Sequence, residues 1–345
     1  MKTIASFLQQ SVDVGACPGA SWVVGNGETV LEQGAVGVLG QGLGPVKPDS
    51  IYDIASMTKI LVTLALMRQL EDGLVRLNDT VGVFFPEYRN AMYDKADITL
   101  HELLTHTSVI SSLHRLYRHV HTREDVFEAI FLSENRTDGK VRYTCEGYIV
   151  LGEIVSRIDG APLDEVVRKR VLEPLGMSDT GYNPSAALME RIAPTEYCPW
   201  RGKMVRGQVH DETAVVLGGV SGNAGVFSTA ADIAKVAVMM LNPKARGSFL
   251  QPPTIKMMTR NYTEGKGSNR GIGWLLAGSD APGGDLMSSR GFGHTGFTGT
   301  SIWVDPDAGL YGILLANRVH PTRENAAFFR VRSIFHNLIV LNYGL

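Results

Sequence analysis

Residues 55–73 read ASMTKILVTLALMRQLEDG, and this stretch predicts a helix at the centre of a domain. Residues 60–67 are apolar except for Thr63, so no face of the helix is suited to water. The pattern ends at Glu71-Asp72-Gly73, where glycine suits the position after a helix. A helix of this kind has to be covered on all sides by the rest of the chain.

The first turn of this helix carries Ser56 and Lys59, three residues apart. At that spacing the two side chains share one helix face and can touch. Burial and the positive end of the helix dipole are expected to lower the pKa of Lys59, and a neutral lysine can act as base for a serine hydroxyl. The alternative is an ordinary helix start, with Ser56 as N-cap and Lys59 solvated. About one S-x-x-K arises by chance in a chain of this length, so the motif alone does not decide.

Strand-like segments flank a long helical region. Residues 20–25 and 29–39 are joined through Asn26-Gly27, which is a strong hairpin signal between apolar runs. Helical patterns dominate from Ser56 to about residue 175. The C-terminal third again predicts strands and then a last helix, at 271–278, 295–306, 309–317 and 323–341.

We therefore predict an α+β fold with one antiparallel sheet that is flanked by helices and built from N- and C-terminal segments, with an inserted all-helical domain. The expected sheet domain comprises residues 1–55 and 225–345, and the mainly helical insertion comprises residues 56–224. An active site is expected in the cleft between the two.

The composition is that of a globular protein, with 345 residues, 44% hydrophobic and 20% charged. A net charge of −2 without any basic run argues against a nucleic-acid partner. No apolar run is long enough to span a bilayer, and the N-terminus lacks a signal-peptide pattern. The three cysteines are widely spaced and form no C-x-x-C pair, which favours a reducing cytoplasm. A removed leader and an extracytoplasmic location stay open as the alternative.

Two further motifs follow ASMTK in order: residues 143–152 read YTCEGYIVLG and residues 293–304 read GHTGFTGTSIWV. Together the three resemble the serine β-lactamase and penicillin-binding-protein superfamily, above all its class C branch, which includes D-Ala-D-Ala carboxypeptidases and β-lactamase-like carboxylesterases. That family has S-x-x-K, then Y-x-N or Y-S-D before an apolar helix, then K-T-G or H-T-G on a strand. The resemblance covers residues 17–317 and implies a β-lactamase/transpeptidase-like fold. Lesser segments that share it are YDIASMTK (52–59), LEDGLVRLNDTV (70–81), ITLHELLTHTS (98–108), LEPLGMSDT (172–180) and GGVSGNAGVFSTAADIAK (218–235).

The resemblance implies three catalytic residues. Ser56 is the nucleophile that forms a covalent acyl-enzyme, and Lys59 is the base or proton shuttle that activates it. Tyr143 is the second general base, which passes the proton to the leaving group. The set follows the logic of nucleophile, base and oxyanion donor with different residue types.

The resemblance also implies the substrate-binding residues. His294, Thr295 and Gly296 line the substrate cleft on an edge strand, where a peptide can pair through its main chain. The backbone N–H groups of Ser56 and Phe297 form the oxyanion hole.

Two positions depart from the family pattern. Cys145 stands where Asn or Asp is usual, and a thiol is a weak hydrogen-bond donor and acceptor. Lys59 is therefore expected to be held less well and amide substrates to bind less well, unless Cys145 is simply a buried cysteine. His294 replaces the usual lysine, so carboxylate recognition is expected to be weaker and pH-dependent. A second triplet, His106-Thr107-Ser108, lies at a helix end and is interpreted as structural.

We predict a serine hydrolase that acts by acyl transfer through a Ser56 acyl-enzyme on an amide or ester, namely a β-lactam, a D-amino-acid peptide or a small ester. The alternative is a catalytically weakened penicillin-binding-like protein that binds a cell-wall peptide as a sensor. The expected partner is a small-molecule or short peptide substrate, without nucleic acid and without a membrane segment, and the oligomeric state is left open. Substrate choice is expected to depend on the loops at residues 86–98, 108–122 and 195–215.

No cofactor and no metal are expected. His114, His119 and His121 cluster in the sequence but lack the i, i+4 histidine pair with a glutamate seen in zinc hydrolases. No cysteine or acidic ligand completes a site beside them.

Overall fold

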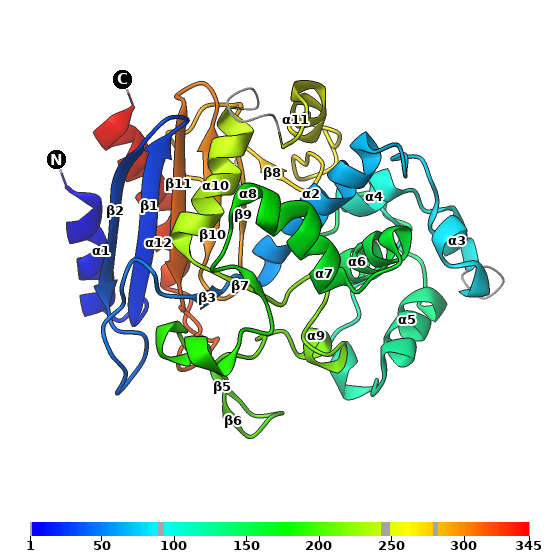
Figure 1. Cartoon of the computed structure of the whole chain (residues 1–345), viewed down its shortest axis with the longest axis horizontal. Helices are drawn as coiled ribbons and strands as arrows, with labels where there is room; N and C mark the ends of the chain where they lie inside the picture. The colour runs from blue at the N-terminus through cyan, green and yellow to red at the C-terminus, as the bar shows by residue number, and fades with distance from the viewer. Residues whose placement is uncertain (1, 89–92, 243–248, 279–281, 345) are drawn as a thin grey trace.

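The computed structural model describes residues 2–88, 93–242, 249–278 and 282–344, and it contains a six-stranded antiparallel sheet with most helices to one side of it (Figure 1). The strands in spatial order are β2 (Val30–Gly37), β1 (Gly19–Asn26), β11 (Leu310–Ala316), β10 (Ser301–Asp305), β9 (Phe292–Thr295) and β8 (Leu275–Leu276). Strand β1 thus pairs with β2 on one side and with β11, from the end of the chain, on the other. The predicted α+β fold, with an antiparallel sheet built from both ends of the chain, is confirmed.

Helices cover both faces of this sheet. Helices α1 (Ile4–Asp13) and α12 (Phe328–Tyr343) pack on each other and on one face, and α10 (Ala230–Leu241) packs on the other. The apolar side chains that α1 and α12 bury, such as Phe7 and Phe335, meet those of β1 and β11. Helix α12 begins later than the predicted residue 323.

Helix α2 (Thr58–Glu71) is the buried central helix that the sequence predicted. Every residue from Thr58 to Met67 is buried. The helix starts two residues later than expected, because Ala55–Met57 form a 3₁₀ turn in which Ala55 has a φ of +47°. Ser56 therefore lies in this turn and does not cap the helix, which corrects the N-cap alternative.

The remaining helices pack mainly around α2 and α6 (Figure 1). They are α3 (Val81–Phe84), α4 (Leu100–Leu104), α5 (Arg123–Leu132), α6 (Glu146–Asp159), α7 (Leu163–Val167), a π-helical turn (Arg168–Leu172), α8 (Glu173–Leu175), α9 (Glu212–Val216) and α11 (Pro252–Met258). Short strands also occur here, namely β3 (Tyr52–Asp53), β4 (Gly181–Tyr182), β5 (Tyr197–Cys198), β6 (Lys203–Met204) and β7 (Val226–Ser228). Because β4, β5 and β6 lie within residues 56–224, this part of the chain is mainly helical and not all-helical as predicted. The domain boundaries at residues 55/56 and 224/225 stay a prediction.

The predicted strand over residues 295–306 is in fact two strands joined by a tight turn. The N–H of Gly296 donates to the carbonyl of Thr300 at 2.8 Å, and Gly299 has a φ of +126°, which favours glycine. Strand β8 is also shorter than the predicted 271–278 and pairs only with Phe292 and Gly293. His294 and Thr295 therefore lie on the penultimate strand β9 and Gly296 in the turn after it, which corrects the predicted edge strand; β8 pairs with β9 at Phe292 and Gly293 and stops short of His294.

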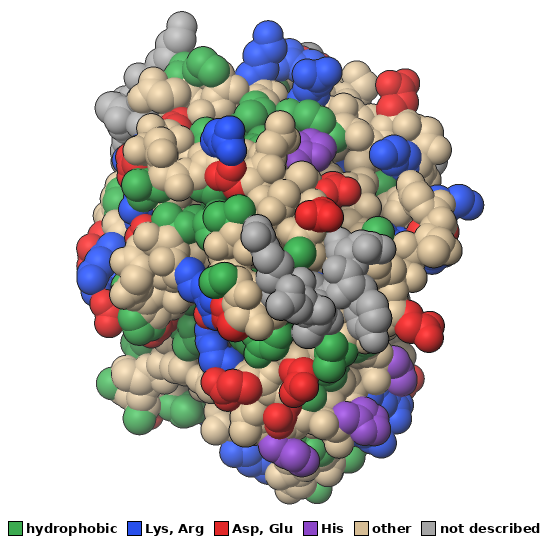
Figure 2. Space-filling model, turned by 90° about the vertical axis from the view of Figure 1, so that its right-hand side faces the viewer, with side chains coloured by type: hydrophobic (Ala, Val, Ile, Leu, Met, Phe, Trp, Pro, Cys, Tyr) green, Lys and Arg blue, Asp and Glu red, His purple; other side chains and the backbone are tan. Residues whose placement is uncertain are grey.

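Acidic and basic side chains are interspersed on the face shown in Figure 2, in keeping with the net charge of −2. None of the helices in the described ranges is long and apolar enough to cross a membrane. Residues 89–92, within the predicted substrate loop 86–98, lie outside the described residues.

A close approach of two glycines sets the position of α6 and gives a first prediction. A Cβ on Gly152 would lie 2.7 Å from the Cα of Gly222, whereas a Cβ on Gly147 in the same helix would make ordinary contacts of 3.5 Å or more. We expect Gly152→Ala to lower the free energy of unfolding by about 1–3 kcal/mol through overpacking. The matched variant Gly147→Ala should raise it by up to about 1 kcal/mol, because alanine is the better helix former. Denaturant unfolding measures both, and equal effects would contradict the close approach.

Candidate active site

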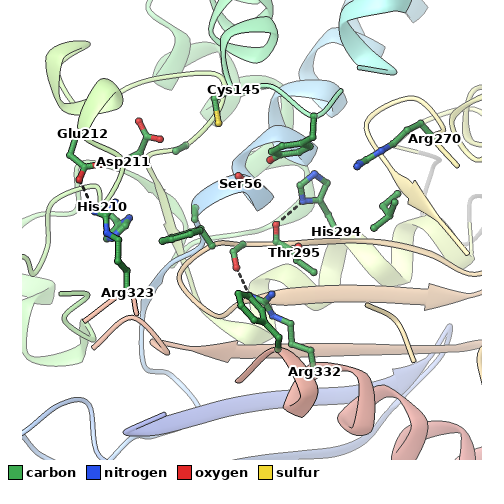
Figure 3. Close-up of a pocket in the computed structure, with 17 residues that line it drawn as sticks. Ser56, Cys145, His210, Asp211, Glu212, Arg270, His294, Thr295, Arg323 and Arg332 are labelled. Carbon is green, nitrogen blue, oxygen red and sulfur yellow. Dashed lines mark hydrogen bonds and ion pairs between the residues drawn. The ribbon is translucent and has the colours of Figure 1, made fainter. Parts of the chain in front are cut away.

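A cavity of about 490 Å³ lies where the turn before α2, the start of α6 and the β9–β10 turn meet (Figure 3). All the predicted site residues but one line this cavity: Ser56, Tyr143, Cys145, His294, Thr295, Gly296 and Phe297. The exception is Lys59, which is fully buried and touches Ser56 from within the protein. The structure thus brings together residues that are far apart in the chain.

The turn that presents Ser56 is fixed by the buried carboxylate of Asp53. One oxygen accepts a hydrogen bond from the N–H of Ala55 at 2.8 Å, and the other accepts from the N–H of His210 at 2.6 Å. Ala55 adopts a left-handed φ that is unusual for a residue other than glycine. Such backbone strain persists only where the surrounding structure holds it, and it is frequent at active sites.

The ammonium of Lys59 has three contacts in the protein. It donates to Ser56 Oγ at 3.1 Å and to the carbonyl of Asn223 at 3.0 Å, and it lies 3.9 Å from Cys145 Sγ. That Cys145 holds Lys59 less well than an asparagine would stays a prediction, but the backbone carbonyl of Asn223 supplies a further, strong acceptor. Asn223 belongs to the segment at residues 218–235 that shares the family resemblance, but the sequence alone assigns it no role.

The expected lowering of the pKa of Lys59 is wrong. Burial acts to lower it, but Cys145 and Tyr143 in their deprotonated forms would raise it further, and the pKa lies above its ordinary value of 10.5. This direction, together with the acceptors Ser56 Oγ and the Asn223 carbonyl, favours the ammonium form of Lys59. In this resting state it donates hydrogen bonds and cannot accept the proton of Ser56.

Tyr143 lies at the cavity wall between three basic side chains. The Lys59 Nζ is 4.9 Å from the centre of its ring, and the Arg270 guanidinium carbon is 5.6 Å from it. The ring of His106 packs against Tyr143 with centroids 4.6 Å apart, and its Nδ1 accepts a hydrogen bond from the N–H of Thr144. His106 therefore supports the predicted base, a contact that the sequence did not reveal.

Cys145 lies beside Lys59 at the cavity wall, as the resemblance implied. Burial raises the pKa of its thiol, and the opposing effect of Lys59 is smaller. The thiol is therefore protonated at neutral pH. All three cysteines, Cys17, Cys145 and Cys198, are free.

The β9–β10 turn is tied to the turn that carries Ser56. The hydroxyl groups of Thr298 and Thr300 donate to the carbonyls of Asp53 and Ile54, at 2.7 Å and 3.1 Å. A side chain on Gly296 would collide with the Ile54 carbonyl, so only glycine allows this approach. These contacts hold the two turns against each other.

Two buried arginines hold the carbonyls of the same turn. Arg332 donates to the carbonyl of Gly296, and Arg318 Nε donates to that of Phe297 at 2.9 Å. The N–H of Phe297 has no protein acceptor among the residues that the structure describes. This N–H is therefore available to a substrate, which suits the oxyanion role that the resemblance implies.

His294 does not behave as expected. Burial, followed by the charges of Lys59 and Arg270, lowers its pKa to about 3. Its Nδ1 lies 2.9 Å from the carbonyl of Thr295. The predicted pH-dependent recognition of a carboxylate is wrong for this residue, because His294 stays neutral throughout the physiological range.

A charged cluster closes the opposite end of the cavity. The ring of His210 stacks on Phe297 with centroids 5.5 Å apart, and its Nε2 lies 2.9 Å from Glu196. Arg323 bridges Glu196 and Glu212, and these contacts with His210 and Arg323 lower the pKa of Glu196 to about 2 despite its burial. Glu196, His210 and Glu212 lie in the predicted substrate loop 195–215, whereas no motif pointed to Arg270, Arg323 or Arg332.

A second cavity, of about 550 Å³, adjoins the first and shares Cys145, Asp211, Glu212 and Arg323 with it. Its wall includes His114 and the aromatic pair Tyr117 and Trp200, from the loops predicted to choose the substrate.

Residues 4–334 match the family described as Beta-lactamase. The chain belongs to the Beta-lactamase family. A family member from Escherichia coli strain K12, provisionally named D-alanyl-D-alanine carboxypeptidase, is 29% identical over 360 residues, which cover 91% of this chain and 81% of the relative. A relative from Salmonella agona with the same provisional name is 30% identical over 312 residues, which cover 80% and 71% of the two chains. Membership of the Beta-lactamase family and these relatives support a hydrolase.

Solved structures confirm the fold of this Beta-lactamase family member. A simvastatin synthase variant from Aspergillus terreus matches with a TM-score of 0.78 at 21% identity, over 99% of this chain and 94% of that one. A class C β-lactamase from Rhodobacter sphaeroides matches with a TM-score of 0.77 at 17% identity, over 97% and 99%.

The neutrality of His294 gives a second prediction. Its ring protons should show no titration in NMR spectra between about pH 5 and 8, whereas in urea-unfolded protein they should titrate near about 6.5. Because the unfolded chain takes up this proton and the folded chain does not until about pH 3, His294 lowers folding stability as the pH falls below about 6.5. His294→Asn assigns the resonance. A midpoint near neutral pH in the folded protein would contradict the burial argument.

Proposed function

We propose that this protein is a serine hydrolase that transfers the acyl group of an amide or ester to Ser56 and then to water. The substrate classes are D-amino-acid peptides, β-lactams and small esters, with D-amino-acid peptides favoured by the names of the relatives. The observation that carries the proposal is the hydrogen bond from the buried Lys59 ammonium to Ser56 Oγ inside a cavity lined by Tyr143 and the H-T-G segment.

The resting charge of Lys59 supports Tyr143 as the residue that accepts the proton of Ser56. When Ser56 Oγ attacks the substrate carbonyl, its proton is passed by way of the Tyr143 phenol oxygen to the leaving group. Lys59 stabilises the negative charge in this cycle. The N–H groups of Phe297 and Ser56 hold the oxyanion of the tetrahedral intermediate.

Deacylation repeats these steps with water in place of Ser56. Water attacks the acyl carbonyl, Tyr143 takes its proton, and Ser56 Oγ leaves and recovers a proton from Tyr143. No residue is changed over the whole cycle, and the products are an acid and the protonated leaving group.

A covalent probe tests the nucleophile. A fluorophosphonate should add one phosphonyl group to the wild-type protein, and peptide mass spectrometry should place it on Ser56. The variant Ser56→Ala should take up no label, while Ser111→Ala, outside the cavity, should label like wild type. An unlabelled wild-type protein, or a label at another serine, would overturn the proposal.

Cys145 tests the alternative of a weakened, peptide-binding sensor. An asparagine at this position restores an amide donor and acceptor beside Lys59, worth about 1 kcal/mol per hydrogen bond, or about fivefold in rate. We expect Cys145→Asn to raise kcat/KM for an amide substrate such as nitrocefin about five- to tenfold, with less effect on p-nitrophenyl acetate. Cys17→Ala is the matched control. Cys17 is buried in the cluster between the sheet and helices α1 and α12 and does not line the cavity.

The sensor alternative predicts a different pattern. Wild type would then bind a D-Ala-D-Ala peptide tightly and show no turnover that Ser56→Ala removes. Turnover that depends on Ser56 but does not respond to Cys145→Asn would mean that the thiol does not limit the chemistry.

A further inference from the structure

Arg332 of helix α12 extends to the β9–β10 turn at the cavity wall (Figure 3). The residue is only 4% exposed, and its guanidinium lies over the rings of Phe328 and Phe329. Its Nη2 donates to the carbonyl of Gly296, whereas its Nε is buried without a hydrogen-bond partner. Burial, followed by the charge of Arg318, lowers the pKa of Arg332 to about 9, and no carboxylate among the described residues raises it. A guanidinium buried without a counter-charge is costly, so its contact with this one carbonyl is not explained by stability.

The carbonyl that Arg332 binds belongs to the same peptide unit as the N–H of Phe297. This peptide is trans, and because a trans peptide is planar its C=O and its N–H point in opposite directions. A donor that holds the Gly296 carbonyl on one side therefore fixes the direction of the Phe297 N–H on the other. Phe297 lines the cavity, and its N–H has no protein acceptor among the residues that the structure describes.

The backbone of the turn is already closed by its own hydrogen bonds. The N–H of Gly299 donates to the Gly296 carbonyl at 3.2 Å, and the N–H of Gly296 donates to the carbonyl of Thr300 at 2.8 Å. What Arg332 adds is a charged donor. A charge-assisted hydrogen bond draws electron density toward the carbonyl oxygen and makes the N–H of the same peptide a stronger donor. A positive charge behind this N–H also favours a negative charge that develops in front of it.

We propose that Arg332 is a positioning residue of the oxyanion hole, whose guanidinium orients and polarises the Gly296–Phe297 peptide so that the Phe297 N–H binds the oxyanion of the tetrahedral intermediate more strongly. The inference rests on the proposed function, because that function makes this N–H an oxyanion donor. Arg332 acts through the peptide and takes part in no covalent or proton-transfer step.

Arg318 provides a comparison within the same turn. It is also buried, and its Nε donates to the carbonyl of Phe297 at 2.9 Å. The peptide unit of that carbonyl carries the N–H of Thr298, which the proposed reaction does not use. The two arginines therefore bind adjacent peptides, and only the one bound by Arg332 contains the oxyanion donor.

The first experiment removes the charge in Arg332→Met and keeps it in Arg332→Lys. An apolar side chain in place of a buried charge is often neutral or stabilising, so denaturant unfolding should show a stability equal to or above that of wild type. With p-nitrophenyl acetate, Arg332→Met should lower kcat/KM about 10- to 100-fold, which is less than the loss of about 10²- to 10³-fold on removing an oxyanion donor itself. Because a single N–H of the guanidinium holds the carbonyl, Arg332→Lys should recover part of this rate.

A boronic acid distinguishes transition-state from ground-state binding. Phenylboronic acid forms a tetrahedral adduct with a serine hydroxyl, and its inhibition constant should rise in Arg332→Met by about the factor by which kcat/KM falls. The affinity of the Ser56→Ala protein for N-acetyl-D-Ala-D-Ala should change by less than about threefold when Arg332→Met is added. Equal losses of stability and of both affinities would assign Arg332 a structural role and overturn the proposal.

Arg330→Met is the matched control, because Arg330 lies on the same helix, is exposed and does not line the cavity. It removes the same charge and should behave as wild type in rate and in inhibition. A loss as large as that of Arg332→Met would mean that net charge alone is responsible, and would refute the assignment.

An NMR measurement separates this inference from the proposed reaction. A hydrogen bond to a carbonyl deshields the amide ¹⁵N nucleus of the next residue, so the Phe297 signal should move to lower frequency in Arg332→Met and part of the way back in Arg332→Lys. Labelling with ¹⁵N-phenylalanine gives twelve signals, of which Phe297→Leu assigns the relevant one. The Thr298 signal should respond in the same way to Arg318→Met. This result decides the role of Arg332 even if Ser56 is not the nucleophile, and an unmoved Phe297 signal in Arg332→Met would refute it.

Discussion

The site depends on one buried positive charge. Lys59 is fully buried in the first turn of α2, and its ammonium is held by Ser56, the carbonyl of Asn223 and the thiol of Cys145. An ammonium in such a place is tolerated only where acceptors surround it, because removing a charge from water is costly. The fold therefore has to bring the 218–225 segment, α6 and the turn before α2 to one point. The close approach of Gly152 and Gly222 is part of how it does so.

Buried hydrogen bonds also fix the backbone on the substrate side of the site. Asp53 uses both carboxylate oxygens to fix the turn before Ser56 and the backbone of His210, while Thr298 and Thr300 bind the carbonyls of that turn from the β9–β10 side. The proposed nucleophile and the proposed oxyanion donor thus belong to one hydrogen-bonded unit, although about 240 residues separate them in the chain. Electrostatic preorganisation of this kind needs no rearrangement when charge develops in the transition state.

The charges of two site residues, Lys59 and His294, differ from those that the motifs predicted. The lysine expected to be neutral is an ammonium, and the histidine expected to titrate near neutral pH stays neutral. Both outcomes depend on burial and on neighbours from other segments, such as Cys145, Tyr143 and Arg270. A family pattern fixes which residue types meet, but it contains neither their depth nor the charges that surround them.

The sequence by itself determined the buried helix over residues 58–71 and the sheet formed from both ends of the chain, because apolar periodicity and turn residues are local properties of a chain. The meeting of Ser56, Tyr143 and His294 was implied by the resemblance of three ordered motifs to a known family. It missed the break between β9 and β10, the partner that Asn223 offers to Lys59, and the support of Tyr143 by His106. The position of Arg270 at the cavity wall could not be predicted from the sequence, because Arg270 belongs to no motif. Only the tertiary structure decided these points, because they arise from contacts between segments that no local pattern connects.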